Sequence, residues 1–176
     1  ASFQRCKGFA DALGVDVRQS MIDSGVDPTV VASKASAYLR KHPDTQAVLA
    51  LGPSSAEPTL QALQKMGLAG KTYFVTFDLS PTIIADIKKG YVDFAIDQQP
   101  YLQGYMAIAV LAIAHENNLR DSAAIIAKLN ANPKFQERLK EYGLKPVYTS
   151  DGVSTGPSFI TRDNVDVVAK YAGQYR

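Results

Sequence analysis

The sequence predicts an α/β fold with a doubly wound parallel sheet. Segments with the three-to-four-residue spacing of amphipathic helices alternate with short strands that are apolar almost throughout. Strands of this kind lack a polar face because helices cover both sides of a parallel sheet. Several helix starts are also marked, since Asp27 before Pro28 and Ser80 before Pro81 place an N-cap ahead of a first-turn proline. The alternation and the caps together indicate repeated strand–helix units.

Each element follows from periodicity and from the residues at its ends. A helical pattern opens the chain at 3–13, and the alternation that follows predicts a strand at 15–22. Gly67 and Gly90 end two later helices, as glycine often does. The remaining predicted strands are 46–51, 72–77 and 92–96, and the remaining predicted helices are 27–40, 53–67, 80–90, 100–118, 122–130, 133–142 and 164–175.

The C-terminal part has a different character. Residues 144–164 are extended and rich in turn residues, and Gly152 and Gly156 give the backbone latitude to bend. The last helix then carries apolar residues at the spacing of a buried stripe: Val165, Val168 and Ala172. We therefore expect this helix to pack against the sheet.

Small or polar residues stand where three of the predicted strands end. Gly52, Asp78 and Gln98 each follow a strand. Ligands of parallel α/β sheets collect outside the carboxyl ends of the strands. The stretch GYVDFAIDQQPYLQGY shows most clearly how a strand ends in polar residues, because its alternating pattern is followed by Asp-Gln-Gln-Pro just before a helix. These positions predict the rim of a cleft.

Composition argues against several classes of function. The chain has 176 residues, is 46% hydrophobic and carries a formal charge of +2 without a basic run. A proper core is therefore expected, and a nucleic-acid-binding surface is not. No apolar run approaches the length of a membrane span. Cys6 is the single cysteine, so no internal disulfide can form.

Motifs for catalysis or metal binding are missing. His42 and His115 lie late in helices and have no partners at the spacing of zinc ligands. A triad of Ser55, His115 and Asp78 can be drawn, but no G-x-S-x-G turn supports it. The stretch LGPSSAEP lacks the G-K-[ST] of a phosphate-binding loop. We therefore predict a protein that is not an enzyme and uses no cofactor or metal.

Three stretches together carry a family resemblance: TFDLSP, IKKGYVDFAIDQQPYLQGY and STGPSFITRDNVDVVAKYAGQYR. The sequence resembles the type I periplasmic binding proteins for simple sugars, such as the ribose and galactose binders. The same fold occurs in the effector domains of lactose-repressor-type regulators. The likeness runs from RCKGF near the start to the final helix, but residues 120–143 depart from it as an insertion.

The resemblance implies a fold of two lobes joined by three crossovers. Family members carry the first lobe, and the first strand of the second, ahead of a segment like FQRCKGF. We therefore expect the chain to be part of a longer protein and to lack most of the N-terminal lobe. Residues 1–98 are expected to form the C-terminal ligand-binding lobe without its first strand. Residues 99–150 should form a helical segment that returns to the N-terminal lobe, and residues 151–176 the last crossover and a C-terminal helix on the C-terminal lobe.

The resemblance also implies which side chains would hold a sugar. Arg5 matches the family's arginine at a helix start, Asp78 its aspartate after the fourth strand, and Gln98 its glutamine at a crossover. An arginine can donate two parallel hydrogen bonds, a carboxylate only accepts, and an amide does both. The alternatives are a surface arginine, an aspartate that caps the next helix, and a plain hinge glutamine.

Two further candidates lie beside these three. Phe77 can stack on the apolar face of a sugar ring or belong to the core. Gly52 stands where several relatives have a hydrogen-bonding Asn, so it either makes room for a bulkier ligand or leaves backbone N–H groups of its turn to make the contact. Asp97 is left out because strand alternation points it away from Gln98.

The expected function is that of a solute-binding receptor in the periplasm. It would capture a monosaccharide or polyol between two lobes and deliver it to the membrane permease of an ABC importer, with the missing N-terminal lobe completing the site. The alternative is a sugar-responsive effector domain of a lactose-repressor-type transcription regulator. The phrases DQQPYLQGY and ITRDNVDVVAKYAGQYR are more similar to the receptors for transported sugars.

Overall fold

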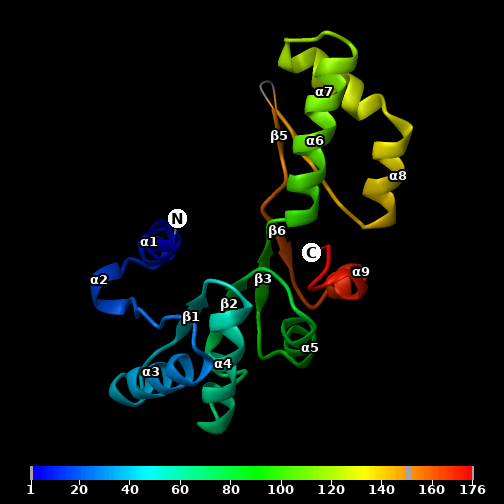
Figure 1. Ribbon diagram of the computed structural model, residues 1–176. Coiled ribbons are helices and arrows are strands. Elements are labelled where there is room, and N and C mark those ends of the chain that lie inside the picture. The colour runs from blue at the N-terminus through cyan, green and yellow to red at the C-terminus, as the bar shows by residue number, and fades with distance from the viewer. Residues whose placement is uncertain (1, 150–151, 176) are drawn as a thin grey trace.

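The computed structural model describes residues 2–149 and 152–175, so the predicted boundary between 150 and 151 lies outside the described residues. It contains a four-stranded sheet with helices against it and a helical extension with a two-stranded sheet (Figure 1). The helices are α1 (Ser2–Leu13), α2 (Val17–Ser20), α3 (Pro28–Lys41), α4 (Pro53–Lys65), α5 (Pro81–Lys89), α6 (Pro100–Glu116), α7 (Ser122–Ala131), α8 (Pro133–Glu141) and α9 (Val165–Val168), which a 3-10 turn (Ala169–Tyr171) follows. The strands are β1 (Ala47–Ala50), β2 (Tyr73–Phe77), β3 (Phe94–Asp97), β4 (Val147–Tyr148), β5 (Val153–Ser154) and β6 (Ser158–Ile160).

The four-stranded sheet has the order β1-β2-β3-β6. β1 runs parallel to β2, with Val48 beside Phe74, and β2 runs parallel to β3. These strands confirm the predicted α/β fold. β6 runs antiparallel to β3, with Phe159 beside Ile96, because the chain returns from the extension at the end of the sheet where β3 leaves it.

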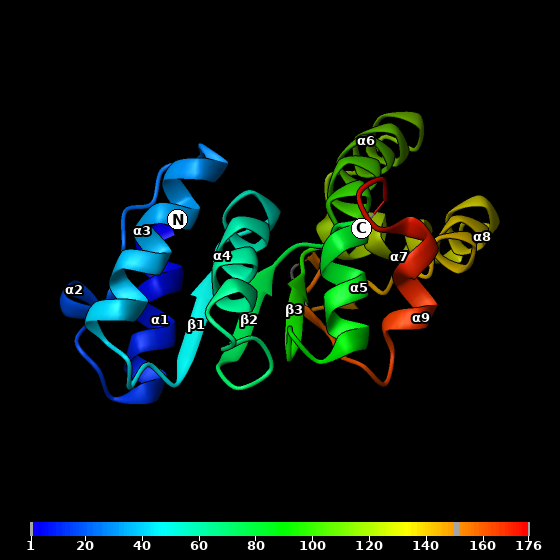
Figure 2. The ribbon, with the colours of Figure 1, turned by 90° about the horizontal axis from the view of Figure 1, so that it is seen from below.

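Helices flank the sheet. α3, α4 and α5 line up along one face, and α1 lies on the other side of β1 (Figures 1 and 2). The predicted caps are present: the Asp27 side chain accepts from the backbone N–H of Val30 at 2.9 Å, and Ser80 accepts from Ile83 at 3.1 Å. Between the sheet and its helices lies the sheet-side core, formed by Leu39, Ala50, Ala56, Leu60, Leu63, Phe74, Leu79, Ile83, Ile84, Ile87, Val92, Ala95, Ile160, Val165, Val168 and Ala172.

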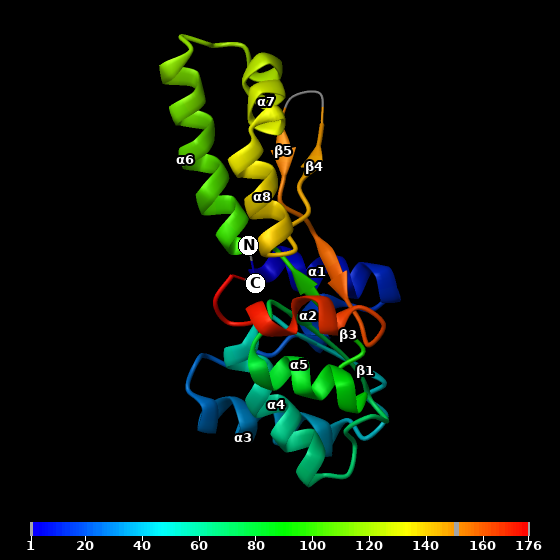
Figure 3. The ribbon, with the colours of Figure 1, turned by 90° about the vertical axis from the view of Figure 1, so that its right-hand side faces the viewer.

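The helical extension has a core of its own. α6 packs against α7, and α7 against α8, beside the antiparallel β4–β5 hairpin (Figure 3). The extension core consists of Leu102, Met106, Ile113, Ile125, Leu129, Phe135, Leu139 and Leu144. Across residues 2–149 and 152–175, no helix is both long enough and apolar enough to span a bilayer.

A tyrosine cluster (Tyr101, Tyr142, Tyr171 and Tyr175) connects the two cores. Tyr142 and Tyr175 stack with ring centroids 4.2 Å apart, and Tyr101 meets Tyr175 edge-on at 5.0 Å. Tyr171 packs edge-on to Tyr142, and its hydroxyl donates to the carbonyl of Glu141. Burial raises the pKa of Tyr142 above its ordinary value. Because Tyr171 and Tyr175 follow α9 while the other two pack on the extension core, the cluster ties α6 and α8 to the C-terminal segment.

The predicted strand at 15–22 is wrong. This segment contains α2, whose N-cap Asp16 accepts from the backbone N–H of Arg18 at 2.9 Å. In the part of the chain that the structure describes, β1 is an edge strand that pairs with β2 alone, so residues 15–22 do not extend the sheet. The apolar side chains of this segment are left exposed: Val15, Met21 and Ile22.

The final helix is shorter than predicted. After α9 the chain continues as a 3-10 turn, in place of a single helix from 164 to 175. The predicted buried stripe is nevertheless present, because Val165, Val168 and Ala172 are at most 8% exposed and belong to the sheet-side core.

Candidate functional site

The five residues singled out in the sequence meet where the parallel strands end. Gly52 follows β1, Phe77 ends β2 with Asp78 next to it, and Gln98 follows β3. Arg5 reaches them from the first turn of α1. All five therefore lie at the carboxyl edge of the parallel strands, the edge at which α/β sheets bind ligands.

A chain of hydrogen bonds runs through three of these side chains. The Arg5 guanidinium donates from Nη2 to Gln98 Oε1 at 2.8 Å, and Gln98 Nε2 donates to Asp78 Oδ1 at 2.7 Å. All three residues are half-buried. A neutral amide thus links a cation to a carboxylate, and each of the three side chains has a hydrogen-bond partner among the other two.

Phe77 lies beneath Arg5. The guanidinium carbon is 4.3 Å from the centroid of the phenyl ring, within the range of a cation–π contact. Phe77 is half-buried and is not one of the residues of the sheet-side core. Arg5 therefore covers one face of the Phe77 ring.

Asp78 does not cap the helix that follows it. Ser80 does so, because its hydroxyl accepts from the backbone N–H of Ile83. Asp78 instead has a left-handed backbone with φ of 60°, and its N–H donates to the carbonyl of Ile96 at 2.9 Å. This conformation leaves the carboxylate beside Gln98, so the capping alternative is wrong.

Gly52 leaves space beside Asp78. Its backbone has φ of 145° and ψ of 172°, a region that is almost reserved for glycine. A Cβ added there would lie 4.0 Å from Asp78 Oδ2. The N–H groups of Ser55 and Ala56 donate to the Gly52 carbonyl, so these two are engaged within the turn. The absence of a side chain at Gly52 thus leaves space beside Asp78.

Two buried neighbours of Gln98, Asp97 and Gln99, are not among the site residues predicted from the sequence. Strand alternation predicts that Asp97 points away from Gln98. Both neighbours are 0% exposed. The burial of a glutamine just before a proline leaves no local pattern, because it depends on segments that are distant along the chain.

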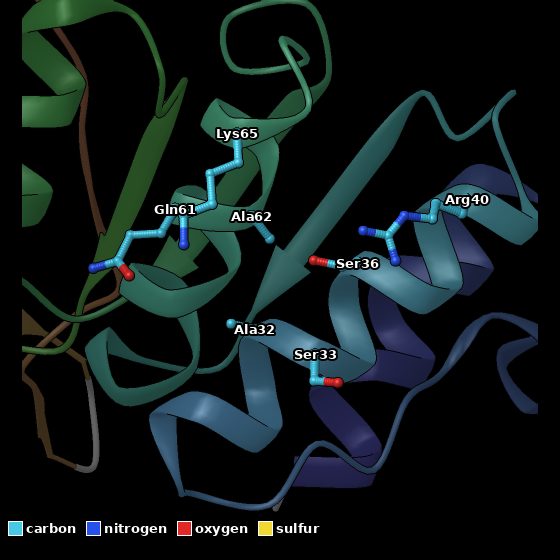
Figure 4. A pocket seen from close by; sticks show the side chains of 7 residues that line it. All are labelled: Ala32, Ser33, Ser36, Arg40, Gln61, Ala62 and Lys65. Atoms are coloured by element: carbon cyan, nitrogen blue, oxygen red, sulfur yellow. The ribbon is translucent and has the colours of Figure 1, made fainter.

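The described residues contain no group of three or more His, Cys, Asp or Glu that could hold a metal ion. Two hollows in the described part of the chain lie away from the five residues. One is a groove of about 540 Å³ between α6, α7 and β5. The other, of about 230 Å³, is lined by residues of α3 and α4. Arg40 of α3 and Lys65 of α4 lie on its two sides (Figure 4).

Comparison with known proteins identifies the family. Residues 1–118 match the family described as a periplasmic binding protein domain. The chain is also 33% identical over 106 residues to the xylose/arabinose-binding protein XylF of Sulfolobus acidocaldarius, an alignment that covers 52% of this chain and 26% of XylF.

Solved structures share the fold. A carbohydrate transporter protein from Acidothermus cellulolyticus, in complex with myo-inositol, matches with a TM-score of 0.61 and 28% identity over 84% of this chain and 42% of its own. GanP, a glucose-galactose binding protein from Geobacillus stearothermophilus, matches with a TM-score of 0.57 and 22% identity over 91% of this chain and 48% of its own. The chain thus spans less than half the length of these relatives. The match to the family model over residues 1–118 shows that the chain belongs to the periplasmic binding protein domain family.

Proposed function

We propose that this chain provides one lobe of a receptor that binds a neutral monosaccharide or polyol. The observation that carries the proposal is the hydrogen-bonded chain of Arg5, Gln98 and Asp78 at the carboxyl edge of the sheet. These side chains offer a paired donor, a mixed group and an acceptor, and a sugar hydroxyl can both donate and accept. Adjacent hydroxyls can therefore satisfy the groups that now satisfy one another.

Charge favours a neutral ligand. An anion would be attracted by Arg5 but repelled by Asp78, and a cation would meet the reverse. Phe77 adds a flat apolar surface for the C–H face of a sugar ring. Gly52 leaves space for the ligand beside the carboxylate.

The named relatives support a sugar or polyol as the ligand. XylF is named for xylose and arabinose, and the protein from Acidothermus cellulolyticus was solved with myo-inositol. One is a binding protein and the other a carbohydrate transporter, which supports a receptor over the effector domain of a transcription regulator. We therefore propose a periplasmic binding protein, not an enzyme, that delivers its ligand to the membrane permease of an ABC importer.

A second lobe would complete the ligand site. α6 is apolar on most sides, and its outward residues Ile108 and Leu111 are 70% and 66% exposed. The groove beside it is lined by apolar side chains such as Met106 and Val110. A helix that is apolar all round is normally buried, which supports a partner lobe against this face.

The proposed division of the chain follows from this arrangement. Residues 1–98 would form the ligand-binding lobe, residues 99–150 the helical part that joins the second lobe, and residues 151–176 the last crossover with its C-terminal helix. The separation of the extension core from the sheet-side core supports the division.

The test is calorimetric titration of the protein expressed from its full gene, with a panel of pentoses, hexoses and inositols. We expect Asp78→Ala to weaken binding of the preferred sugar by at least about tenfold, equivalent to about 1.4 kcal/mol. Deoxy analogues should lose about 1–3 kcal/mol for each missing hydroxyl, because a buried partner is left unsatisfied. Asp44→Ala is the matched control, since it removes an exposed carboxylate that is not among the site residues.

Two results would contradict the proposal. Equal affinities for Asp78→Ala and Asp44→Ala would remove Asp78 from the site. A panel without any binding, together with tight binding of an amino acid, would exclude a sugar receptor.

A further inference from the structure

Gln98 is the middle one of three residues that lead from β3 toward α6. Its neighbours Asp97 and Gln99 are polar, yet both are 0% exposed. Burying a polar side chain costs free energy unless hydrogen bonds satisfy it. The groups that hold these two neighbours therefore determine how Gln98 is presented to the site.

The side chain of Gln99 binds two distant segments. Its Oε1 accepts from the backbone N–H of Lys145 at 2.7 Å, and its Nε2 donates to the Lys145 carbonyl at 3.0 Å. The same Nε2 also donates to the carbonyl of Thr155. Lys145 and Thr155 stand on either side of the β4–β5 hairpin, so one amide joins the outgoing chain to the chain that returns.

Asp97 also holds the connection between β3 and α6, which we call the crossover. Its Oδ1 accepts from the backbone N–H of Gln99 at 2.9 Å, and its Oδ2 lies 3.5 Å from the Ser158 hydroxyl. The returning chain is pressed against it, because a Cβ at Gly156 would lie 3.1 Å from the Asp97 carbonyl. Gln99 has a left-handed φ of 53°, which a residue other than glycine keeps where its surroundings impose it.

The Gln98 side chain has other partners than these anchors. The backbone carbonyl of Gln98 accepts from Gln103 Nε2 at 2.9 Å, while its side-chain amide lies between Arg5 and Asp78. The crossover is thus held at Asp97 and at Gln99, the residues before and after Gln98. The Gln98 side chain contacts Arg5 and Asp78.

We propose that Gln99 is a positioning residue of the sugar site. Its buried amide holds the crossover in the one conformation that aims Gln98 at Arg5 and Asp78, so Gln99 acts on the ligand through Gln98 without touching it. This inference rests on the proposed function, because it requires Gln98 to contact the sugar.

The chemistry of the site explains why an amide stands at this position. Gln99 accepts from one backbone N–H and donates to two carbonyls, and a primary amide supplies both kinds of group. Methionine has a similar shape but neither donates nor accepts well. A glutamate keeps the acceptor for Lys145 but places an oxygen against the two carbonyls. Gln99→Met and Gln99→Glu therefore remove the anchor in different ways.

A double-mutant cycle tests the proposal. The protein expressed from its full gene is titrated with whichever of xylose, arabinose and myo-inositol it binds most tightly, as unaltered protein, Gln99→Met, Gln98→Ala and the double variant. Gln99→Met should weaken binding about tenfold, since a misdirected Gln98 loses its hydrogen bonds. In the Gln98→Ala background the same change should alter affinity by no more than about twofold, because the residue it positions is gone.

Stability controls separate positioning from general damage. Each variant is unfolded in urea, and Asp121→Ala serves as a control that removes the N-cap of α7. Asp121→Ala should lower stability and leave sugar affinity unchanged. If Gln99→Met does not fold, Gln99→Glu enters the cycle with the same expected pattern.

The possible outcomes are distinct. Unchanged affinity in the Gln99 variants, while Gln98→Ala loses affinity, would overturn the positioning role alone. Losses that multiply in the double variant would also overturn it, because Gln99 would then act by another route. Unchanged affinity in Gln98→Ala would count against the proposed sugar site itself.

Discussion

Three residues around the site have backbone conformations that most residues avoid. Asp78 and Gln99 are left-handed, with φ of 60° and 53°, and Gly52 has φ of 145°. For a residue other than glycine such a conformation costs about 1–3 kcal/mol and persists where the surrounding structure fixes it, whereas glycine adopts it without that cost. Asp78 and Gln99 therefore carry backbone strain beside the proposed ligand.

Gly52→Ala should destabilise the protein, whereas Gly8→Ala should not. An alanine at position 52 would have to adopt the φ of 145°, at a cost of about 1–3 kcal/mol. Gly8 lies within α1, where an added Cβ would meet nothing within 4 Å, so alanine there should stabilise the helix by about 0.5–1 kcal/mol. Urea unfolding followed by circular dichroism gives both values. Equal free energies of unfolding for the two variants would show that alanine is not strained at position 52.

The candidate site residues could be selected from the sequence because strand ends and family motifs are local patterns. The mutual hydrogen bonds of Arg5, Gln98 and Asp78 could not be, because they depend on where α1 lies relative to the sheet. The role of Gln99 was equally inaccessible, since the partners of its side chain lie 46 and 56 residues along the chain. The types of side chain at the candidate site can therefore be predicted from the sequence, but their arrangement in space cannot.

Helices and strands differed in how well the sequence predicted them. A helix satisfies its hydrogen bonds within its own segment, so caps such as Asp27 and Ser80 mark real helix starts. A strand needs a neighbour, and residues 15–22 form no strand where the described edge of β1 is unpaired. The last helix ends earlier than its apolar spacing predicts, although Val165, Val168 and Ala172 still reach the sheet-side core.

Val168→Ala should destabilise the protein, and its neighbour provides the control. Val168 is 2% exposed in the sheet-side core, so losing two methyl groups should cost about 2 kcal/mol. Val167 is 61% exposed, and alanine there should change stability by no more than about 0.5 kcal/mol. The free energy of unfolding in urea measures both. If the two variants lose the same stability, α9 does not pack on the sheet as described.

The described chain packs around two cores that are joined at few places. The crossover at Gln98 and Gln99, the returning segment before β6 and the tyrosine cluster connect them. Units linked in this way are expected to move relative to one another unless a large apolar interface prevents it. Such freedom is what a receptor needs if its lobes close around a ligand.

A substitution in the extension core and one in the sheet-side core should each lower the local stability of its own part of the chain. Leu129 is 1% exposed in the extension core, and Leu63 is 0% exposed in the sheet-side core. Either leucine changed to alanine should cost its own part about 2–5 kcal/mol. Hydrogen exchange read by mass spectrometry should then accelerate in α6–α8 for Leu129→Ala, and in β1–β3 with α4 for Leu63→Ala. Acceleration over the whole chain in both variants would instead indicate a single cooperative unit.

The tyrosine cluster also gives the protein an optical reporter of its own. The chain has nine tyrosines and no tryptophan, so its ultraviolet fluorescence comes from tyrosine alone. Four of these rings lie together where the extension meets the C-terminal segment, and the Tyr171 hydroxyl donates to a backbone carbonyl there. Tyrosine emission depends on such a hydrogen bond and on the distance between neighbouring rings. A rotation of the extension against the sheet that separates these rings should therefore change the emission, without an attached dye.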